Sequence, residues 1–307
     1  PYVENIVYSI NYDSTYGKLD DKFQITNTNL IENKTSKIKI TNHNSLNDID
    51  LTNIDIIIDS SGKKEDTELL RKLPVSAIFL THPNKDADIN LILGVNEDKL
   101  DLKKHKIIST SSCNATALLP ALKLLDDKKG ILCGDIVTIH PLLNHQRVLD
   151  GKYVESQTRG VDCNFEFGRS STQNIIPNKT TTIDACSYVL PHINKNLITS
   201  NSLRVPTDTV GAINVTLFTK ENSTKDEIIN IFKEYEQNQK FPIVLNNFEP
   251  LVSSDFKKEN FTTIIDHRYT STINNMVKLL VWYDNEWGYA SKTVEILKFF
   301  TNKKGQE

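Results

Sequence analysis

The sequence predicts an α/β protein in which a doubly wound parallel sheet is followed by a region of α+β type with a mixed sheet. In the first part, short apolar runs rich in β-branched residues alternate with helical stretches, which is typical of parallel strands joined by helices. Polar or Gly-containing turns follow several of these runs. From about residue 130 the apolar runs and their connections both lengthen, which predicts the mixed sheet of the second part.

The composition is that of a soluble globular protein with room for two domains. Of the 307 residues, 38% are hydrophobic and 24% are charged, and the formal net charge is −3. This balance argues against a nucleic-acid or membrane partner, and no apolar run approaches the length of about 20 residues that spans a bilayer. The four cysteines (Cys113, Cys133, Cys163 and Cys186) lack Cys-x-x-Cys spacing, which favours a reducing compartment and predicts a cytoplasmic protein.

The elements of the first region can be predicted in order. Residues 2–8 have a helical pattern, and residues 23–41 alternate polar and apolar side chains around Asn-rich turns, as a small hairpin does. Strands are predicted at residues 54–58, 77–80 and 107–109, with a helix after the first that ends at Lys72.

Polar residues after two of these strands are candidate ligand contacts. Ser61 and Gly62 follow the first strand, and Thr81 and His82 follow the second. Ligands of a doubly wound sheet bind at the carboxyl ends of its strands, so these residues either contact a cofactor or simply form turns.

The chain is organised around a cysteine at a predicted helix start. A strand and a Ser-rich turn lead to Cys113, and the helix that follows places Leu118, Leu122 and Leu125 on one face before Gly130 ends it. Unpaired N–H groups and the helix dipole favour the thiolate form of a cysteine in that position. Cys113 is therefore either a reactive nucleophile or a buried structural cysteine.

A histidine at the end of the next strand favours the nucleophile. Residues 134–140 have the pattern of a buried strand that ends at His140, and Pro141 stops it. A strand-end histidine near a helix-start cysteine supplies a nucleophile and its base from adjacent elements.

The remaining elements complete the second region. A long polar connection covers residues 145–174, strands are predicted within 203–219 and at 276–283, and an amphipathic helix is predicted at 224–237. A final helix places Ala290, Val294 and Leu297 on one face. A connection longer than about 15 residues is usually functional or disordered.

Together these segments resemble the glyceraldehyde-3-phosphate dehydrogenase family, including its relative erythrose-4-phosphate dehydrogenase. The resemblance runs from residue 1 nearly to the end, and the Cys113 and His140 segments carry it together with Arg-Val-Pro-Thr at residues 204–207. The most specific match is Trp-Tyr-Asp-Asn-Glu-Trp-Gly-Tyr at residues 282–289.

The resemblance implies a Rossmann-type sheet and a catalytic domain with a mixed sheet. It implies a dinucleotide-binding domain at residues 1–112, which here lacks its first βαβ unit, and a catalytic domain at 113–289. Residues 290–307 form a helix that returns to the first domain. The long polar connection is similar to the family's S-shaped loop, which lies at the tetramer core beside the cofactor.

The activity implied is the NAD-dependent oxidation of a phosphorylated sugar aldehyde, glyceraldehyde 3-phosphate first, by a cytoplasmic homotetramer of glycolysis. The Cys113 thiolate attacks the aldehyde, His140 takes the hydroxyl proton, and inorganic phosphate or water cleaves the thioester that remains after hydride transfer. The resemblance further assigns phosphate binding to Ser112, Thr180 and Arg204, and cofactor binding to Asn285, Tyr289, Ser61 and Gly62, with no metal. Without the resemblance, Arg204 would be read as a surface ion pair and Tyr289 as a core tyrosine.

Two departures from the family pattern leave the substrate open. The family's Ser-Cys-Thr-Thr-Asn-Cys is Ser-Cys-Asn-Ala-Thr-Ala at residues 112–117, and Leu143 and His145 stand where the glyceraldehyde enzyme has phosphate-binding threonines. A leucine side chain cannot donate to phosphate. Residues 140–146 are nearer to the erythrose enzyme, so oxidation of erythrose 4-phosphate that ends in hydrolysis is one alternative. A non-catalytic family member kept as a binding or assembly protein is another.

The start of the family pattern has no counterpart in this sequence. The family opens with a strand and a Gly-x-Gly-x-x-Gly turn that binds the dinucleotide pyrophosphate, and no such turn occurs here. We expect the native protein to contain such a segment before Pro1, because the first strand of a doubly wound sheet lies in its middle and its loss would leave unpaired strand edges. The residues that choose between NAD and NADP lie in that segment, so both dinucleotides stay open.

Overall fold

The computed structural model describes residues 2–63, 66–151 and 165–305. The chain divides into two compact units, Pro1–Ile54 and Asp55–Glu307, and every candidate site residue falls in the second. The domain boundaries expected at residues 112 and 289 stay a prediction. Among the described helices, none has both the length and the apolar character needed to cross a bilayer.

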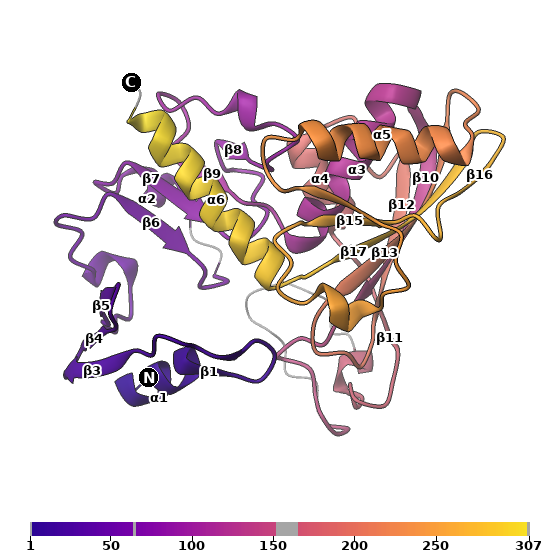
Figure 1. The fold of residues 1–307 in the computed structure, drawn as a ribbon. Coiled ribbons are helices and arrows are strands. Elements are labelled where there is room, and N and C mark those ends of the chain that lie inside the picture. The colour runs from indigo at the N-terminus through magenta and orange to yellow at the C-terminus, as the bar shows by residue number, and fades with distance from the viewer. Residues whose placement is uncertain (1, 64–65, 152–164, 306–307) are drawn as a thin grey trace. The chain divides into compact units, whose positions relative to one another are not determined.

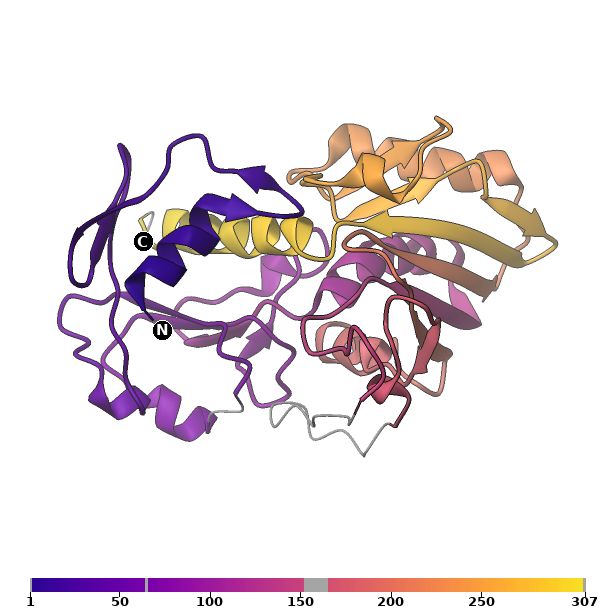
Figure 2. The same cartoon turned by 90° about the horizontal axis from the view of Figure 1, so that it is seen from below.

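The smaller unit contains the predicted helix and two small antiparallel sheets. Its elements are α1 (Val3–Asn11), β1 (Tyr12–Asp13), β2 (Gly17–Lys18), β3 (Gln24–Asn27), β4 (Leu30–Glu32), β5 (Lys37–Lys39) and the 3-10 turn η1 (Leu46–Asp48). Strands β1 and β2 pair, as do β3-β4-β5, so the predicted hairpin is confirmed with a third strand. Figure 2 shows α1, in indigo, leading directly into β1. The Asn11 side chain bonds both the N–H and the C=O of Phe23 at 2.8 Å, which ties the helix end to β3.

The predicted parallel sheet is confirmed in the larger unit. Its strands are β6 (Ile56–Asp59), β7 (Ala77–Leu80), β8 (Ile89–Asn90) and β9 (Ile107–Ser109), in the order β6-β7-β9-β8, with α2 (Thr67–Arg71) after β6 and the 3-10 turn η2 (Glu97–Lys99) after β8. All three pairs are parallel. Strand β6 begins two residues later than predicted, and β8 is too short to give a sequence pattern. The register places Asp59, Leu80 and Ser109 side by side at the carboxyl end of the sheet.

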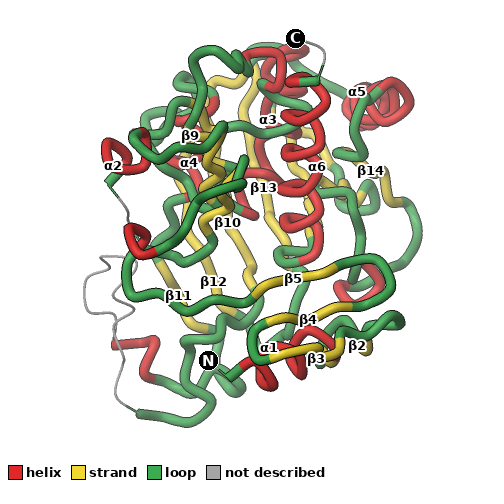
Figure 3. The backbone as a smooth tube through the Cα atoms, turned by 90° about the vertical axis from the view of Figure 1, so that its left-hand side faces the viewer, coloured by secondary structure: helices red, strands yellow, loops and turns green. Residues whose placement is uncertain are grey.

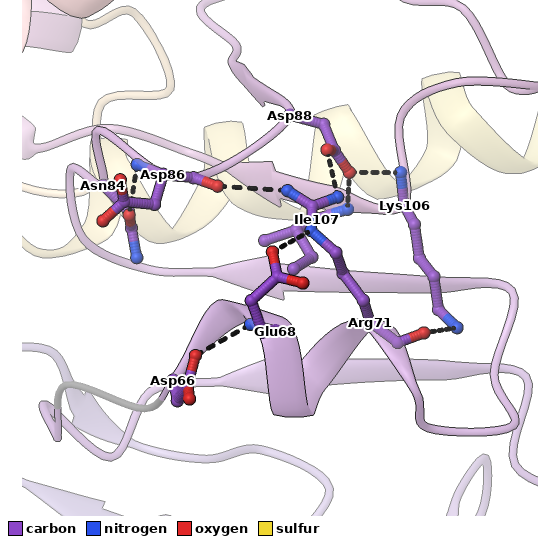
Figure 4. A network of polar contacts seen from close by, with 8 residues as sticks. All are labelled: Asp66, Glu68, Arg71, Asn84, Asp86, Asp88, Lys106 and Ile107. Atoms are coloured by element: carbon purple, nitrogen blue, oxygen red, sulfur yellow. Dashed lines mark hydrogen bonds and ion pairs between the residues drawn. The ribbon is translucent and has the colours of Figure 1, made fainter.

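The amino ends of β8 and β9 are held by a polar network around Asp88 (Figure 4). Asp88 Oδ2 accepts from the backbone N–H groups of Lys106 and Ile107 at 2.8 and 2.7 Å, and Oδ1 accepts from the Arg71 guanidinium. Lys106 Nζ donates in turn to the Arg71 carbonyl at 2.8 Å. Burial by itself raises the pKa of Asp88, but the bonds from Ile107, Arg71 and Lys106 outweigh it and hold that pKa below its usual value. The network thus fixes α2 to the start of both strands.

The predicted mixed sheet is also confirmed. Its strand order is β11-β12-β10-β13-β17-β15-β14, and β16 pairs with β17. The strands are β10 (Ile131–His140), β11 (Ile176–Asn178), β12 (Ile198–Arg204), β13 (Gly211–Thr219), β14 (Val244–Asn247), β15 (Thr263–Asp266), β16 (Ser271–Ile273) and β17 (Met276–Tyr283). The pairs β10/β12 and β14/β15 are parallel and the others are antiparallel. Figure 1 shows β10, β12, β13 and β17 as the long strands, and α5 packs against β14 and α3.

Besides α2, the described part of this unit contains four longer helices. They are α3 (Cys113–Lys129), α4 (Thr182–Val189), α5 (Lys225–Asn238) and α6 (Trp287–Lys304), with the 3-10 turns η3 (Phe165–Gly168) and η4 (Ser253–Phe256). The predicted face of α3 is confirmed, because Leu118, Leu122 and Leu125 are fully buried. The predicted helix at 224–237 is confirmed as α5, which opens with a capping box at Thr224. Figure 3 shows α3 and α6, in red, lying side by side.

The final helix is confirmed, but it buries a different face from the predicted one. Val294 is 49% exposed, whereas Ile296 and Phe300 are buried and Phe300 meets Phe79 of β7 edge-on at 5.5 Å. The buried face also carries Lys292, whose Nζ is paired with Glu295 at 2.6 Å. Because this polar residue interrupts the buried stripe, apolar periodicity points to the wrong side of the helix. Of the long connection at 145–174, residues 152–164 lie outside the described part of the chain.

Candidate active site

The turn between β9 and α3 makes Cys113 the first residue of the helix. Ser111 has a φ of 62°, in the left-handed region that non-glycine residues rarely adopt. Ser112 is the N-cap, and its Oγ accepts from the N–H of Ala115 at 3.3 Å. The predicted helix start is therefore confirmed, and the half-buried Cys113 lies at the positive end of the α3 dipole.

Cys113 faces His140, the last residue of β10. The distance from Cys113 Sγ to His140 Nε2 is 3.8 Å, and the imidazole is 4% exposed. His140 Nδ1 lies 2.9 Å from the carbonyl oxygen of Pro141. A carbonyl oxygen can only accept, so Nδ1 carries a proton and Nε2 can accept the thiol proton.

Arg204 is the neighbour of His140 across the sheet. Strand β12 runs parallel to β10 with these two residues in register, and the N–H of Val205 donates to the His140 carbonyl at 3.0 Å. Arg204 is only 7% exposed, so the simple reading of a surface ion pair is wrong. Its charge also acts on Tyr283: burial and the Cys113 sulfur raise the pKa of that phenol, and Arg204 opposes the rise.

Two residues that the sequence did not single out complete the surroundings of the thiol. The Tyr283 hydroxyl donates to Asn114 Oδ1 at 2.6 Å, and its ring meets that of His140 at 71° with 6.5 Å between centroids. Cys113 Sγ lies 3.6 Å from the same Oδ1. Both had a signal in the sequence, because Tyr283 belongs to the specific run at residues 282–289 and Asn114 is a departure from the family pattern.

Thr180 reaches this group through a second threonine. Asn114 Nδ2 donates to Thr182 Oγ1 at 3.1 Å, and that hydroxyl shares a hydrogen bond with Thr180 Oγ1 at 2.7 Å. Ser112 precedes the cysteine directly. The segments around the thiol thus supply the guanidinium of Arg204 and the hydroxyl groups of Ser112 and Thr180. These are groups that suit the binding of a phosphate.

The side chains of Asn285 and Tyr289 each form a hydrogen bond with the backbone of a residue that has a positive φ. Asn285 Oδ1 accepts from the N–H of Val210 at 3.1 Å, and Val210 has a φ of 65°. The Tyr289 hydroxyl donates to the carbonyl of Ser111 at 3.1 Å. Such backbone costs energy, most of all for a β-branched residue, and persists where its surroundings enforce it. Burial raises the pKa of Tyr289, which keeps its hydroxyl a neutral donor.

Ser61 and Gly62 lie on an exposed turn after β6. Asp59 Oδ1 accepts from the N–H and the hydroxyl of Ser61 at 2.9 and 2.6 Å, and Gly62 has a φ of 71°. In the part of the chain that the structure describes, no hydrogen bond joins this turn to the group around Cys113. The register of β6, β7 and β9 nevertheless puts this turn and the turn that leads to Cys113 at the carboxyl edge of the same sheet.

The other thiols differ from Cys113 in their surroundings. Cys186 is fully buried in α4, and burial raises its pKa far above the usual value. Cys133 is exposed on β10, and Cys163 lies outside the described residues. Within the described ranges, no group of three or more His, Cys, Asp or Glu side chains could hold a metal ion.

Known proteins resemble this chain along almost its whole length. Residues 112–285 match the family model described as glyceraldehyde 3-phosphate dehydrogenase, C-terminal domain. A glyceraldehyde-3-phosphate dehydrogenase of Priestia megaterium is 30% identical over 303 residues, which cover 97% of this chain and 88% of the relative. Glyceraldehyde-3-phosphate dehydrogenase 2 of Streptomyces avermitilis is 33% identical over 305 residues, with 96% and 86% covered. The enzyme of Buchnera aphidicola is 33% identical over 304 residues, with 97% and 88% covered.

Proposed function

The chain belongs to the glyceraldehyde-3-phosphate dehydrogenase family and is a dehydrogenase of that type, and from this we propose that it oxidises a phosphorylated sugar aldehyde with NAD as acceptor. Glyceraldehyde 3-phosphate is the first candidate substrate. The observation that carries the proposal is the 3.8 Å approach of Cys113 Sγ to His140 Nε2, with Nδ1 bound to the Pro141 carbonyl. A thiol beside an imidazole of fixed tautomer suits covalent catalysis at a carbonyl.

In the proposed reaction the chain's own groups act on the aldehyde. The sulfur of Cys113 bonds to the carbonyl carbon while its proton passes to His140 Nε2, and His140 then delivers that proton to the carbonyl oxygen, which becomes the hydroxyl of a hemithioacetal. His140 then takes the hydroxyl proton when the carbon is oxidised. A bound nicotinamide would supply the acceptor for the hydride. The acyl group stays on Cys113 as a thioester, which remains reactive toward inorganic phosphate or water.

Arg204, Thr180 and Ser112 are the proposed phosphate-binding residues. Arg204 is buried beside His140, and a guanidinium binds a phosphate through paired, charge-assisted hydrogen bonds. Thr180 is joined to Asn114 through Thr182, which brings a hydroxyl toward the cysteine. These positions support substrates that carry an anion near the aldehyde.

Asn285 and Tyr289 are the residues proposed to contact the nicotinamide of the cofactor, and Asn285 can form a hydrogen bond with its carboxamide group. Asn285 Oδ1 is occupied by donors from Val210 and Thr209, so its Nδ2 is the group that can donate to a bound carbonyl. The Tyr289 hydroxyl donates to the carbonyl of Ser111, two residues before Cys113. Tyr289 belongs to the same run as Asn285, at residues 282–289. Ser61 and Gly62, at the carboxyl end of β6, are proposed to meet the other part of the dinucleotide. No residue is assigned to the pyrophosphate, because this sequence contains no Gly-x-Gly-x-x-Gly turn.

The second candidate is oxidation of erythrose 4-phosphate with release of the acyl group by hydrolysis. It is favoured by Leu143, which offers no donor where the glyceraldehyde enzyme has a phosphate-binding threonine. For either substrate we propose the homotetramer and the cytoplasmic location that go with the family.

A steady-state assay tests the proposal. NADH formation is measured by its absorbance with glyceraldehyde 3-phosphate or erythrose 4-phosphate, with and without inorganic phosphate, for the parent and for Cys113→Ala. The proposal requires turnover that Cys113→Ala abolishes. Stimulation by phosphate would support phosphorolysis, and phosphate-independent turnover would support the erythrose reading. Equal rates for the parent and Cys113→Ala would refute the covalent mechanism.

A further inference from the structure

The side chain directly after the nucleophile is bound on three sides. Asn114 is the second residue of α3, and its Oδ1 is approached by Tyr283 OH at 2.6 Å and by Cys113 Sγ at 3.6 Å. Its Nδ2 donates to Thr182 Oγ1 at 3.1 Å. One half-buried carboxamide therefore connects α3, β17 and α4 at the reactive thiol.

The partners of Asn114 leave its amide little freedom. Tyr283 is 1% exposed, and its ring occupies the space above Gly211 of the neighbouring strand, where an added Cβ would lie 2.6 Å from Tyr283 Cζ. The phenol therefore cannot swing away from Oδ1. Thr182 is also buried and is bound in turn to Thr180. The amide is thus held with its oxygen toward both Tyr283 and the sulfur.

Two groups beside the thiol can each accept its hydrogen bond. Asn114 Oδ1 and His140 Nε2 lie at 3.6 and 3.8 Å from Cys113 Sγ, and a single S–H can donate to only one of them at a time. A bond to the imidazole leads toward ionisation, because the imidazole can keep the proton. A bond to the carboxamide oxygen stabilises only the protonated sulfur, because an amide oxygen does not take a proton near neutral pH.

We propose that Asn114 is a positioning residue that holds the Cys113 sulfur in line with His140 and, in the resting protein, competes with His140 for the thiol proton. The inference rests on the proposed role of Cys113 as the nucleophile. It gives a purpose to the residue by which this chain departs from the family's Ser-Cys-Thr-Thr-Asn-Cys. An aldehyde bound near the sulfur would be attacked once the thiol has given up its hydrogen bond to the amide oxygen and its proton has passed to the imidazole.

The pH dependence of cysteine alkylation tests the proposal without any dehydrogenase assay. The rate of iodoacetamide labelling at Cys113, followed by peptide mapping, is measured from pH 5 to 9 for the parent, Asn114→Ala and Asn114→Asp. For Asn114→Ala we expect the midpoint of the profile to move to lower pH by about 0.5 to 1 unit, since one hydrogen bond to the protonated form is lost. For Asn114→Asp we expect a move to higher pH, because a carboxylate next to the sulfur opposes its ionisation.

Opposite shifts cannot come from a folding defect, which would move both variants in one direction. Asn230→Ala, which removes an exposed helical asparagine from α5, is the matched control and should leave the profile unchanged. Turnover of Asn114→Ala should fall about tenfold or more although its thiol ionises more readily, because the sulfur is no longer aligned.

The outcomes also separate this inference from the proposed function. Unchanged midpoints in both Asn114 variants, or shifts of the same sign, would overturn the positioning role whatever the activity. Opposite shifts in a protein that oxidises neither sugar phosphate would leave the positioning role standing and refute the proposed substrate.

Discussion

The two ends of strand β9 show opposite ways of placing polar groups. At its start, Asp88 takes hydrogen bonds of 2.8 and 2.7 Å from the backbone of Lys106 and Ile107, together with the Arg71 guanidinium. Beyond its end, Cys113 Sγ contacts Asn114 Oδ1 at 3.6 Å and His140 Nε2 at 3.8 Å, and a thiol is a weak hydrogen-bond donor. Residues 108–112 thus separate the backbone that is bonded to a charged carboxylate from a thiol whose hydrogen bonds are weak.

This difference follows from what each end has to do. A carboxylate that is partly removed from water costs free energy unless strong bonds compensate it, so the half-buried Asp88 is surrounded by donors and serves to hold the fold. A nucleophile must instead leave its partners when it attacks, and the weak hydrogen bonds of a thiol keep that cost small. We therefore expect changes at Asp88 to alter stability, and changes around Cys113 to alter reactivity.

The largest effect is expected from the base at the reactive end. His140→Asn should lower turnover about 10²- to 10⁴-fold, because the acceptor for the thiol and hydroxyl protons is lost. Iodoacetamide labelling of Cys113 should slow as well, since the thiolate loses its partner. Steady-state kinetics and labelling rates measure the two effects. Unchanged labelling would show that the imidazole does not act on the sulfur.

Arg204 tests whether the reactive end binds an anion. Arg204→Ala should reduce kcat/KM for the phosphorylated aldehyde about 10- to 150-fold, because a charge-assisted bond to phosphate contributes about 1.5–3 kcal/mol. An unphosphorylated analogue should lose far less. Equal losses with both substrates would mean that this buried arginine serves only the fold.

Asp88 tests the structural end. Asp88→Ala should lower the free energy of unfolding by about 1–3 kcal/mol, because two backbone N–H groups and a guanidinium lose their acceptor. Urea denaturation measures the loss. Cys113 labelling of the folded variant is the control and should match the parent. A large change in labelling would show that the two ends of β9 are coupled and would break the contrast drawn between them.

The thiols themselves provide a smaller contrast. Cys113 should react with iodoacetamide about tenfold faster than Cys133 at pH 7, because Cys113, unlike Cys133, combines a helix N-terminus with a nearby imidazole. Cys186 should not react in the folded protein, since it is fully buried with a raised pKa. Peptide mapping gives the three rates, and comparable values for Cys113 and Cys133 would contradict the assignment.

The smallest effect concerns acid. The pKa of Asp88 is held below its usual value, so its contribution to stability is present above the pKa of an unfolded aspartate, near 4, and is lost as the pH falls below it. The free energy of unfolding of Asp88→Asn should therefore fall less than that of the parent between pH 5 and pH 3. Urea denaturation at each pH measures both free energies. If the parent and Asp88→Asn lost the same free energy of unfolding, Asp88 would not contribute to the pH dependence of stability.

Much of the fold and of the site was determined by the sequence alone. The apolar spacing of Leu118, Leu122 and Leu125 gives α3, the run at residues 276–283 gives β17, and the Ser-rich turn before Cys113 gives the helix start. These features are local, because periodicity, capping and turn preference act over a few residues. The family motifs added candidate roles, which remain proposals for the individual residues.

Other features were decided only by the tertiary structure. The register of β10 and β12 sets Arg204 beside His140, and β17 brings Tyr283 to Asn114 across 169 positions of the chain. The buried face of α6 was likewise mispredicted, because Lys292 is buried there with Glu295 as its partner. A side chain's hydrogen-bond partner depends on which distant strand packs next to it, and no local pattern encodes that choice.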